Sequence, residues 1–276
     1  MRIPFRTGSC IKMLLKKSSY KPFINQTNGL LLCTPFKVGS TSLCKTIEKT
    51  FRIKRVWLRD AAKVKKVIAK EKPVILKGHT TVPINALLSS QKIRLSAWIT
   101  IIRRPFEMIP SCYFQDIDNP DYPYYFGSRR VINRAPVSDL IAQFMAFDWQ
   151  QWPPISFTYN FSKIRKYTGI NLWQKSFDRD SGFTVHRTRS GPVDFVGVIR
   201  TDKISDPIAL FDFFGKMNLI DESNAESSVI RLKTGNRSRA KWYGRKYESL
   251  LSNLPNEYYL KYREMNKQIV DCFYKV

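Results

Sequence analysis

The segment Leu95–Ile102, LSAWITII, is a near-continuous run of apolar residues. A strand with one face in water would alternate apolar and polar residues, so this run predicts a strand that is buried on both faces. Strands of that kind belong to parallel sheets with helices packed on either side. The segment therefore predicts an α/β fold built around a buried, mostly parallel sheet.

The remainder of the first half follows the same alternation. Short apolar runs predict further strands, and segments with helical spacing of apolar residues predict the helices between them. The expected strands are residues 30–32, 56–58 and 74–76, and the expected helices are residues 41–51, 60–70 and 84–89. We therefore predict a three-layer, doubly wound sheet flanked by helices.

The second half is expected to be mainly helical. Residues 119–135 are rich in Pro, Tyr and Arg and read as a loop over one edge of the sheet. Helices are expected at residues 137–152, 155–167 and 206–217, a strand at residues 193–200, and a helical tail from Arg239 onward, interrupted by Pro255.

A length of 276 residues suits one large α/β domain, which we place at residues 29–276. Residues 1–28 are basic and have no apolar stretch like that of a signal peptide. We expect them to form a solvated arm, or one that touches an anionic membrane surface. No apolar run is long enough to span a membrane, and five cysteines without a C-x-x-C pair favour a reducing, cytoplasmic location.

The charge of the chain indicates an anionic partner. There are 47 lysines and arginines against 22 acidic residues, a formal net charge of +25. Nucleic acid, an anionic membrane surface, an acidic small molecule and an acidic polysaccharide all fit such a charge. Only two histidines are present, His79 and His186, so a multi-histidine metal centre is not expected. We assign His186 no role.

The segment after the first expected strand has the features of an anion-binding loop. Residues 34–42 read TPFKVGSTS and lead from a strand into a helix. Unpaired N–H groups and the positive end of the helix dipole favour an anion at such a junction. A lysine adds a charge, and three hydroxyls add donors. The residues expected to bind the anion are Lys37, Val38, Gly39, Ser40, Thr41 and Ser42.

This loop is not a Walker A motif, because its lysine precedes the glycine instead of following it. No aspartate that would hold Mg²⁺ is evident after a strand. A P-loop kinase that acts on a small molecule is therefore an alternative with two observations against it.

Further polar residues follow the other expected strands. His79 comes after residues 74–76, and Arg103 comes directly after Ile102. Since the carboxyl ends of parallel strands meet at one edge, Lys37, His79 and Arg103 are expected to converge there. Ser111 lies eight residues beyond Arg103, about two turns into the next expected helix, so both are expected to reach one phosphate.

Taken together, these segments resemble the sulfotransferase superfamily. Residues 37–41, KVGST, resemble its 5′-phosphosulfate loop, K-S-G-T-T. Residues 103–111, RRPFEMIPS, resemble its 3′-phosphate motif, in which a serine follows the arginine of R-x-P by eight residues. Residues 77–79, KGH, fall between them, as the family's K-T-H segment does. Residues 161–170, 177–183, 241–247 and 273–274 look like the branch linked to capsular polysaccharide synthesis.

The resemblance implies a donor, a reaction and residue roles. The donor would be 3′-phosphoadenosine 5′-phosphosulfate, and its sulfonyl group would pass to a hydroxyl of a polysaccharide or glycolipid without a metal. Lys37 would stabilise the leaving phosphate, while Arg103 and Ser111 would hold the 3′-phosphate. His79, with an ordinary pKa near ~6.5, would accept the proton of the hydroxyl.

One alternative belongs to another class, a basic nucleic-acid-binding protein. The net charge and scattered Lys-Tyr and Arg-Tyr pairs favour it, but no RNP, KH, helix-turn-helix or zinc pattern is present. The lysines of residues 60–70 fit an ordinary solvated helix face. Lipid, steroid and protein tyrosine acceptors are also open on the sequence alone.

Overall fold

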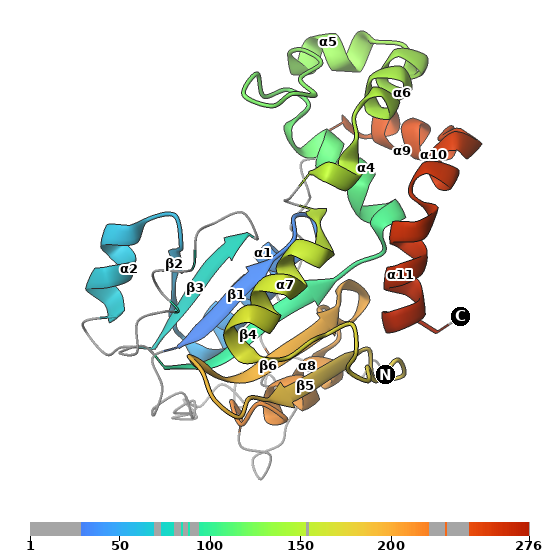
Figure 1. Cartoon of the computed structure of the whole chain (residues 1–276). Helices are drawn as coiled ribbons and strands as arrows, with labels where there is room; N and C mark the ends of the chain where they lie inside the picture. The colour runs from blue at the N-terminus through green and yellow to red at the C-terminus, as the bar shows by residue number, and fades with distance from the viewer. Residues whose placement is uncertain are drawn as a thin grey trace, which may run out of the picture.

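The computed structural model describes residues 29–68, 73–79, 84, 88, 94–152, 155–220, 230 and 243–275. The expected basic arm at residues 1–28 and most of the expected helix at residues 84–89 lie outside them. The described strands form one six-stranded sheet (Figure 1). They are β1 (Leu30–Thr34), β2 (Lys54–Trp57), β3 (Val74–His79), β4 (Leu95–Ile102), β5 (Phe183–Arg187) and β6 (Val193–Arg200).

The sheet has the order β2-β3-β1-β4-β6-β5 and is mostly parallel. Only β5 runs antiparallel, against β6 at one edge. The α/β class and the mostly parallel sheet are thus confirmed. Their cause lies in the central strands, since every residue of β1 and of β4 is buried. These strands pair directly, with Leu30 opposite Ala97 and Leu32 opposite Ile99.

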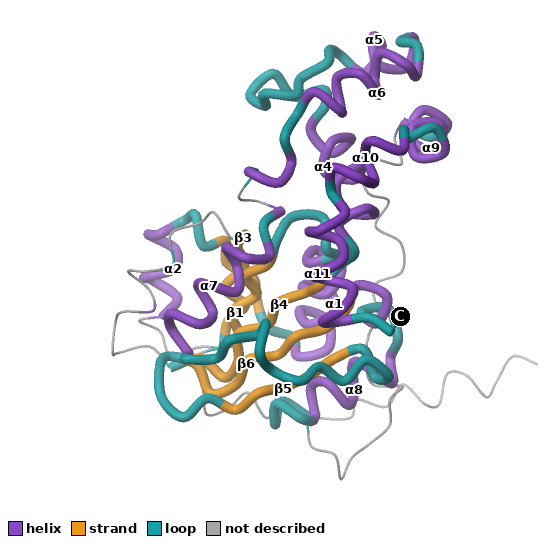
Figure 2. Tube along the Cα trace, turned by 45° about the vertical axis from the view of Figure 1, so that its right-hand side comes forward, coloured by secondary structure: helices purple, strands orange, loops and turns teal. Residues whose placement is uncertain are grey.

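Helices cover both faces of the sheet. The described α-helices are α1 (Ser40–Phe51), α2 (Ala61–Ile68), α4 (Pro105–Asp116), α5 (Arg129–Arg134), α6 (Val137–Ala146), α7 (Phe157–Thr168), α8 (Pro207–Gly215), α9 (Arg245–Ser252), α10 (Asn256–Lys261) and α11 (Arg263–Phe273). Helix α7 lies on one face, and α1 and α8 lie on the other (Figures 1 and 2). Among the described residues, no helix has both the length and the apolar character needed to cross a membrane.

A helical lobe rises from the carboxyl edge of the sheet. Helix α4 starts just beyond β4 and leads away from the sheet to α5, α6, α9 and α10 (Figure 1). Helix α11 packs against α4 and returns the chain to the sheet. The lobe and the end of the chain therefore flank the edge at which β1, β3, β4 and β6 end.

A buried polar contact joins the two central strands to α7. The amide of Asn160, which is fully buried, donates from Nδ2 to the carbonyl of Cys33 at 3.2 Å. Its Oδ1 accepts a hydrogen bond from the hydroxyl of Thr100 at 2.9 Å. Asn160 thereby fixes the end of β1, directly before the anion-binding loop.

Asn160→Ala is expected to lower the free energy of unfolding by about 2–4 kcal/mol, because it leaves a buried carbonyl and a buried hydroxyl without this partner. Chemical denaturation followed by circular dichroism measures the change. Asn133→Ala, at an exposed asparagine on α5, is the matched control and should change stability by less than about 0.5 kcal/mol. A loss as small for Asn160→Ala as for the control would contradict this account of the core.

Three expectations from the sequence differ from the structure. Residues 119–135 are not all loop, because α5 forms within them; it buries only Ile132 and is too short to show a helical period. The helix expected at residues 137–152 ends at Ala146, and a 3₁₀ turn (Trp149–Gln151) capped by Asp148 follows. Strand β5 was not expected, because this edge strand has just one buried residue, Phe183, and so shows no apolar run.

Candidate functional site

The loop between β1 and α1 makes two tight left-handed turns. Lys37 has a φ of 57° and Gly39 a φ of 89°. A φ of 89° is one that residues with a side chain rarely adopt, and a Cβ atom on Gly39 would also lie 2.4 Å from Cδ1 of Ile204, so glycine is strongly favoured there. The loop is thus held in one shape against the segment that follows β6.

The loop ends at an uncapped helix N-terminus. Gly39 is the N-cap residue of α1 and supplies no side chain, and the first turn of α1 contains no acidic residue. The first N–H groups of any helix lack intrahelical partners, and here the positive end of the dipole is not neutralised by a neighbouring carboxylate in α1. Ser40 and Thr41 stand in this first turn. The arrangement suits a phosphate or sulfate group.

A second lysine lies beneath the loop. Lys77, near the end of β3, is fully buried, and its Nζ donates to the Oγ1 of Thr41 at 2.8 Å. The same Nζ lies 4.8 Å from the centre of the Trp57 ring. Burial lowers the pKa of Lys77 to about 8, so its ammonium is still largely charged at pH 7. The sequence predicts no role for Lys77, because the expected strand at residues 74–76 ends before this lysine, whereas β3 extends to His79.

The structure brings Lys37 and Arg103 into direct contact. Arg103 follows β4 and donates from Nη1 to the backbone oxygen of Lys37 at 2.9 Å. The Nζ of Lys37 donates in turn to Oε1 of Gln115 on α4 at 2.6 Å. The two residues that the sequence assigned to opposite ends of one ligand therefore lie side by side at the carboxyl edge of the sheet.

Thr201 fastens this edge from the neighbouring strand. It opens the 3₁₀ turn Thr201–Lys203 after β6, and its hydroxyl lies 2.9 Å from the carbonyl of Val38 and 3.0 Å from that of Ile102. The side chain of Val38 is fully buried. The loop, β4 and β6 are thus joined through one hydroxyl, which the sequence did not indicate.

His79 ends β3 at the same edge. It is paired in register with Thr34, the last residue of β1, and its Nδ1 lies 3.4 Å from the Thr34 carbonyl oxygen. Its ring stacks on Phe36 with centroids 3.8 Å apart. Burial, together with the charge of Lys77, lowers the pKa of His79 to about 4. The imidazole of His79 is therefore neutral at pH 7, whereas a histidine with the ordinary pKa near ~6.5 would be partly protonated there.

The low pKa of His79 predicts an unusual pH dependence if this residue is the base. The neutral ring accepts protons, so the rate at saturating substrate should stay level from pH 7 down to about 5 and fall only as the pH approaches 4. The rate measured across buffers from pH 4 to 8 tests this. His79→Ala should lower the plateau by about a hundredfold or more. A rate that halves near pH 6.5, or a variant with full activity, would contradict the assignment.

Ser111 is less open than the sequence suggested. Its hydroxyl donates to the carbonyl of Glu107 at 3.2 Å and lies 3.2 Å from the Tyr247 hydroxyl of α9. Only 4% of its surface is exposed. Glu107 occupies the turn between Arg103 and Ser111 and lies 3.6 Å from Arg103. Any phosphate that Ser111 contacts would also meet Tyr247, which is far away in the sequence and carries no motif.

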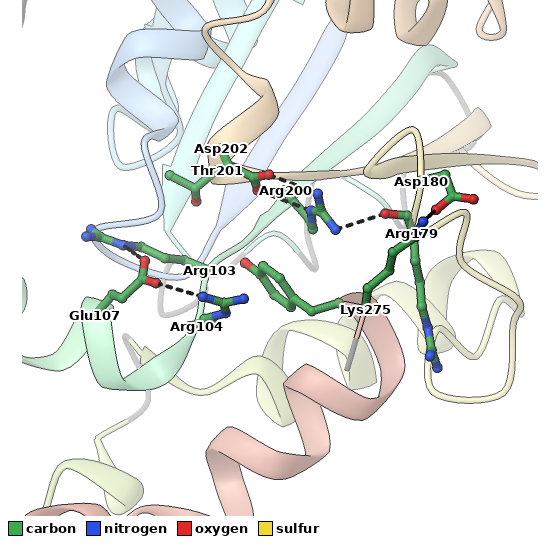
Figure 3. A pocket seen from close by; sticks show the side chains of 10 residues that line it. Arg103, Arg104, Glu107, Arg179, Asp180, Arg200, Thr201, Asp202 and Lys275 are labelled. Atoms are coloured by element: carbon green, nitrogen blue, oxygen red, sulfur yellow. Dashed lines mark hydrogen bonds and ion pairs between the residues drawn. The ribbon is translucent and has the colours of Figure 1, made fainter.

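A cavity of about 590 Å³ opens beside Arg103, between the ends of β4 and β6 and the end of the chain (Figure 3). Five of its lining residues are cationic and three are acidic, so the cavity favours an anion. The lining residues are Arg103, Arg104, Glu107, Arg179, Asp180, Arg200, Thr201, Asp202, Tyr274 and Lys275.

The end of the chain forms one wall of this cavity. The guanidinium carbons of Arg104 and Arg200 lie 4.7 and 5.0 Å from the centre of the Tyr274 ring. Arg200 also makes two hydrogen bonds to the carboxylate of Asp202, at 3.1 and 2.9 Å. Lys275 pairs with Asp180 (Figure 3). The Tyr274 ring thus packs against Arg104 and Arg200, and Asp202 fixes the orientation of Arg200. The sequence did not predict these contacts.

The arrangement can bind an extended anion along one edge. The loop and helix N-terminus offer one anion site, the cavity offers an adjacent basic space, and a neutral imidazole stands on the other side of the loop. In the described part of the chain, no cluster of histidine, cysteine or acidic side chains is arranged to hold a metal ion.

No protein-family model matches this chain, and no curated protein matches it significantly.

Proposed function

We propose that this protein is a sulfotransferase that moves the sulfonyl group of 3′-phosphoadenosine 5′-phosphosulfate to a hydroxyl of a carbohydrate. The observation that carries the proposal is the 2.9 Å contact between Arg103 and the backbone of Lys37. It joins the lysine loop, suited to a phosphosulfate, to an arginine that borders a basic cavity. A donor with phosphate groups at both its 5′ and 3′ positions needs two such anion sites next to one another.

The residues present fit this donor. The loop residues 37–42 and the N-terminus of α1 would hold the 5′-phosphosulfate, and Lys77 would support them through Thr41. The 3′-phosphate would lie against Arg103. The Nε of Arg103 is buried and makes no hydrogen bond among the described residues, and the carboxylate of Glu107 lies 3.6 Å from it. A ligand oxygen at hydrogen-bond distance would satisfy this donor better than the ion pair at 3.6 Å does. On this proposal the sheet is that of the P-loop-like sulfotransferase fold.

The residues at the edge divide the reaction between them. His79 would take the proton of the acceptor hydroxyl, whose oxygen forms the new bond to sulfur. Lys37 would neutralise the charge that develops on the bridging oxygen as its bond to sulfur breaks. The products are a sulfate ester and adenosine 3′,5′-bisphosphate, with the proton left on His79. Because protein cations supply the positive charge, no step in this scheme requires a metal.

A thermal-shift assay with adenosine 3′,5′-bisphosphate tests the proposal. A ligand that binds only the folded protein raises its melting temperature, and above the Kd this rise grows with the logarithm of the ligand concentration. We expect a concentration-dependent rise with the bisphosphate in buffer that contains EDTA. The proposal fails if the bisphosphate leaves the melting temperature unchanged at millimolar concentration.

A further inference from the structure

An arginine pair lies on a tryptophan next to the proposed base. The ring of Trp57, at the end of β2, has its centre 6.4 Å from the centre of the His79 ring. The guanidinium carbons of Arg55 and Arg59 lie 5.6 and 5.5 Å from the centre of the Trp57 ring. One aromatic ring therefore spans the space between His79 and two arginines.

Arg59 is the arginine that is available to a ligand. Arg55 is half-buried and lies 3.8 Å from the carboxylate of Glu48. Arg59 is exposed, and no ion pair connects it to any other described residue. A guanidinium held on an aromatic face keeps its hydrogen-bond donors for a carboxylate or a sulfate.

The part of the sequence that contains Arg59 is strongly basic. Residues 44–66 contain nine lysines and arginines against two acidic residues. They include β2, the outermost strand on this side of the described sheet. Strand β2 lies on the β3 side of β1, whereas β4 and β6, which border the cavity, lie on the other side. The cavity proposed for the donor therefore does not account for the arginines at β2.

We infer that the acceptor is an acidic glycan, with a carboxylate or sulfate group bound by Arg59 while a hydroxyl of the same or the neighbouring sugar reaches His79. This inference rests on the proposed sulfotransferase function and names the substrate class of its acceptor side. Arg59 selects the acceptor and takes no part in the transfer step.

The rings near His79 favour a glycan over a single-stranded nucleic acid. Proteins bind single strands by stacking successive bases on open aromatic faces. Here Phe36 is stacked on His79 at 3.8 Å, and the Trp57 ring is contacted by Lys77 as well as by the two arginines. The ring faces are thus already engaged, while the cations around them are suited to the anionic groups of a sugar chain.

The test measures binding of three fluorescently labelled probes to the full chain by anisotropy at 0.15 M salt. The probes are a heparin hexasaccharide, the neutral maltohexaose and a single-stranded DNA 12-mer. We expect heparin to bind at least about tenfold more tightly than the neutral glycan and than the DNA. Arg59→Ala should raise the heparin Kd by about tenfold or more, the loss expected for a charge-assisted hydrogen bond. Arg187→Ala, an exposed arginine on the opposite edge strand β5, is the matched control and should change that Kd by less than about twofold.

Two results would overturn the inference. In one, Arg59→Ala and Arg187→Ala weaken heparin binding equally, which means that only diffuse charge acts. In the other, DNA binds as tightly as heparin, which means that the surface serves a nucleic acid. Adenosine 3′,5′-bisphosphate is titrated into the same proteins. If the bisphosphate binds the wild type and Arg59→Ala equally well, a negative result with the glycans contradicts only the inference about the acceptor. If the bisphosphate binds neither protein, the proposed sulfotransferase function fails, whatever the glycans do.

Discussion

Lys37→Ala is expected to lower the rate of sulfonyl transfer by at least about a hundredfold. Removing one group that stabilises the charge of a transition state typically costs a factor of about 10²–10³ in rate. Lys37 carries its ammonium at the edge of the loop, 2.6 Å from Gln115, beside the proposed position of the phosphosulfate. The rate is measured as release of adenosine 3′,5′-bisphosphate under saturating donor and acceptor.

The control for Lys37→Ala removes a lysine elsewhere. Lys175→Ala takes away an exposed lysine between α7 and β5 and should leave the rate within about twofold of the wild type. Alanine and lysine tolerate the left-handed backbone at position 37 equally poorly, so the substitution adds no new strain there. A variant that keeps a tenth or more of the wild-type rate would show that another group stabilises the leaving phosphate.

Arg103→Ala is expected to weaken binding of adenosine 3′,5′-bisphosphate by about ten- to a hundredfold. A hydrogen bond to a charged group contributes about 1.5–3 kcal/mol, which corresponds to that factor in Kd. Arg103 borders the basic cavity and also holds the loop through the carbonyl of Lys37. Isothermal titration calorimetry measures the affinity.

A second ligand separates the two roles of Arg103. Adenosine 5′-monophosphate has no 3′-phosphate, so its affinity should change by less than about threefold in Arg103→Ala if the arginine mainly binds that phosphate. Arg103→Lys keeps one charge but loses the planar fork, and should restore only part of the affinity for the bisphosphate. Equal losses for both nucleotides would mean that Arg103 acts by holding the loop and not by binding the 3′-phosphate.

The sequence predicted the sheet well because the sheet is built from buried strands. Strand β4 has the expected bounds, Leu95–Ile102, and β1 and β6 lie where apolar runs placed them. Helix α7 ends at Thr168, one residue beyond the expected end, because Gly169 takes the left-handed C-cap conformation that glycine favours. Elements without a long apolar pattern, such as β5 and α5, could not be found in this way.

For the candidate site, the sequence predicted the convergence of strand ends but not their surroundings. Lys37, His79 and Arg103 do meet at one edge, because each ends a parallel strand or follows one within three residues. The low pKa of His79 depends on burial that no spacing reveals. The cover that Tyr247 places over Ser111 depends on the packing of α9 against α4, and that packing joins segments far apart in the chain.

The most direct test of the central claim is a calorimetric comparison of two nucleotides with the wild-type protein in the presence of EDTA. The account predicts that adenosine 3′,5′-bisphosphate binds at least about tenfold more tightly than adenosine 5′-monophosphate, because the second phosphate adds charge-assisted contacts at Arg103. Equal affinities, or binding of ATP alone and only after Mg²⁺ is added, would contradict it.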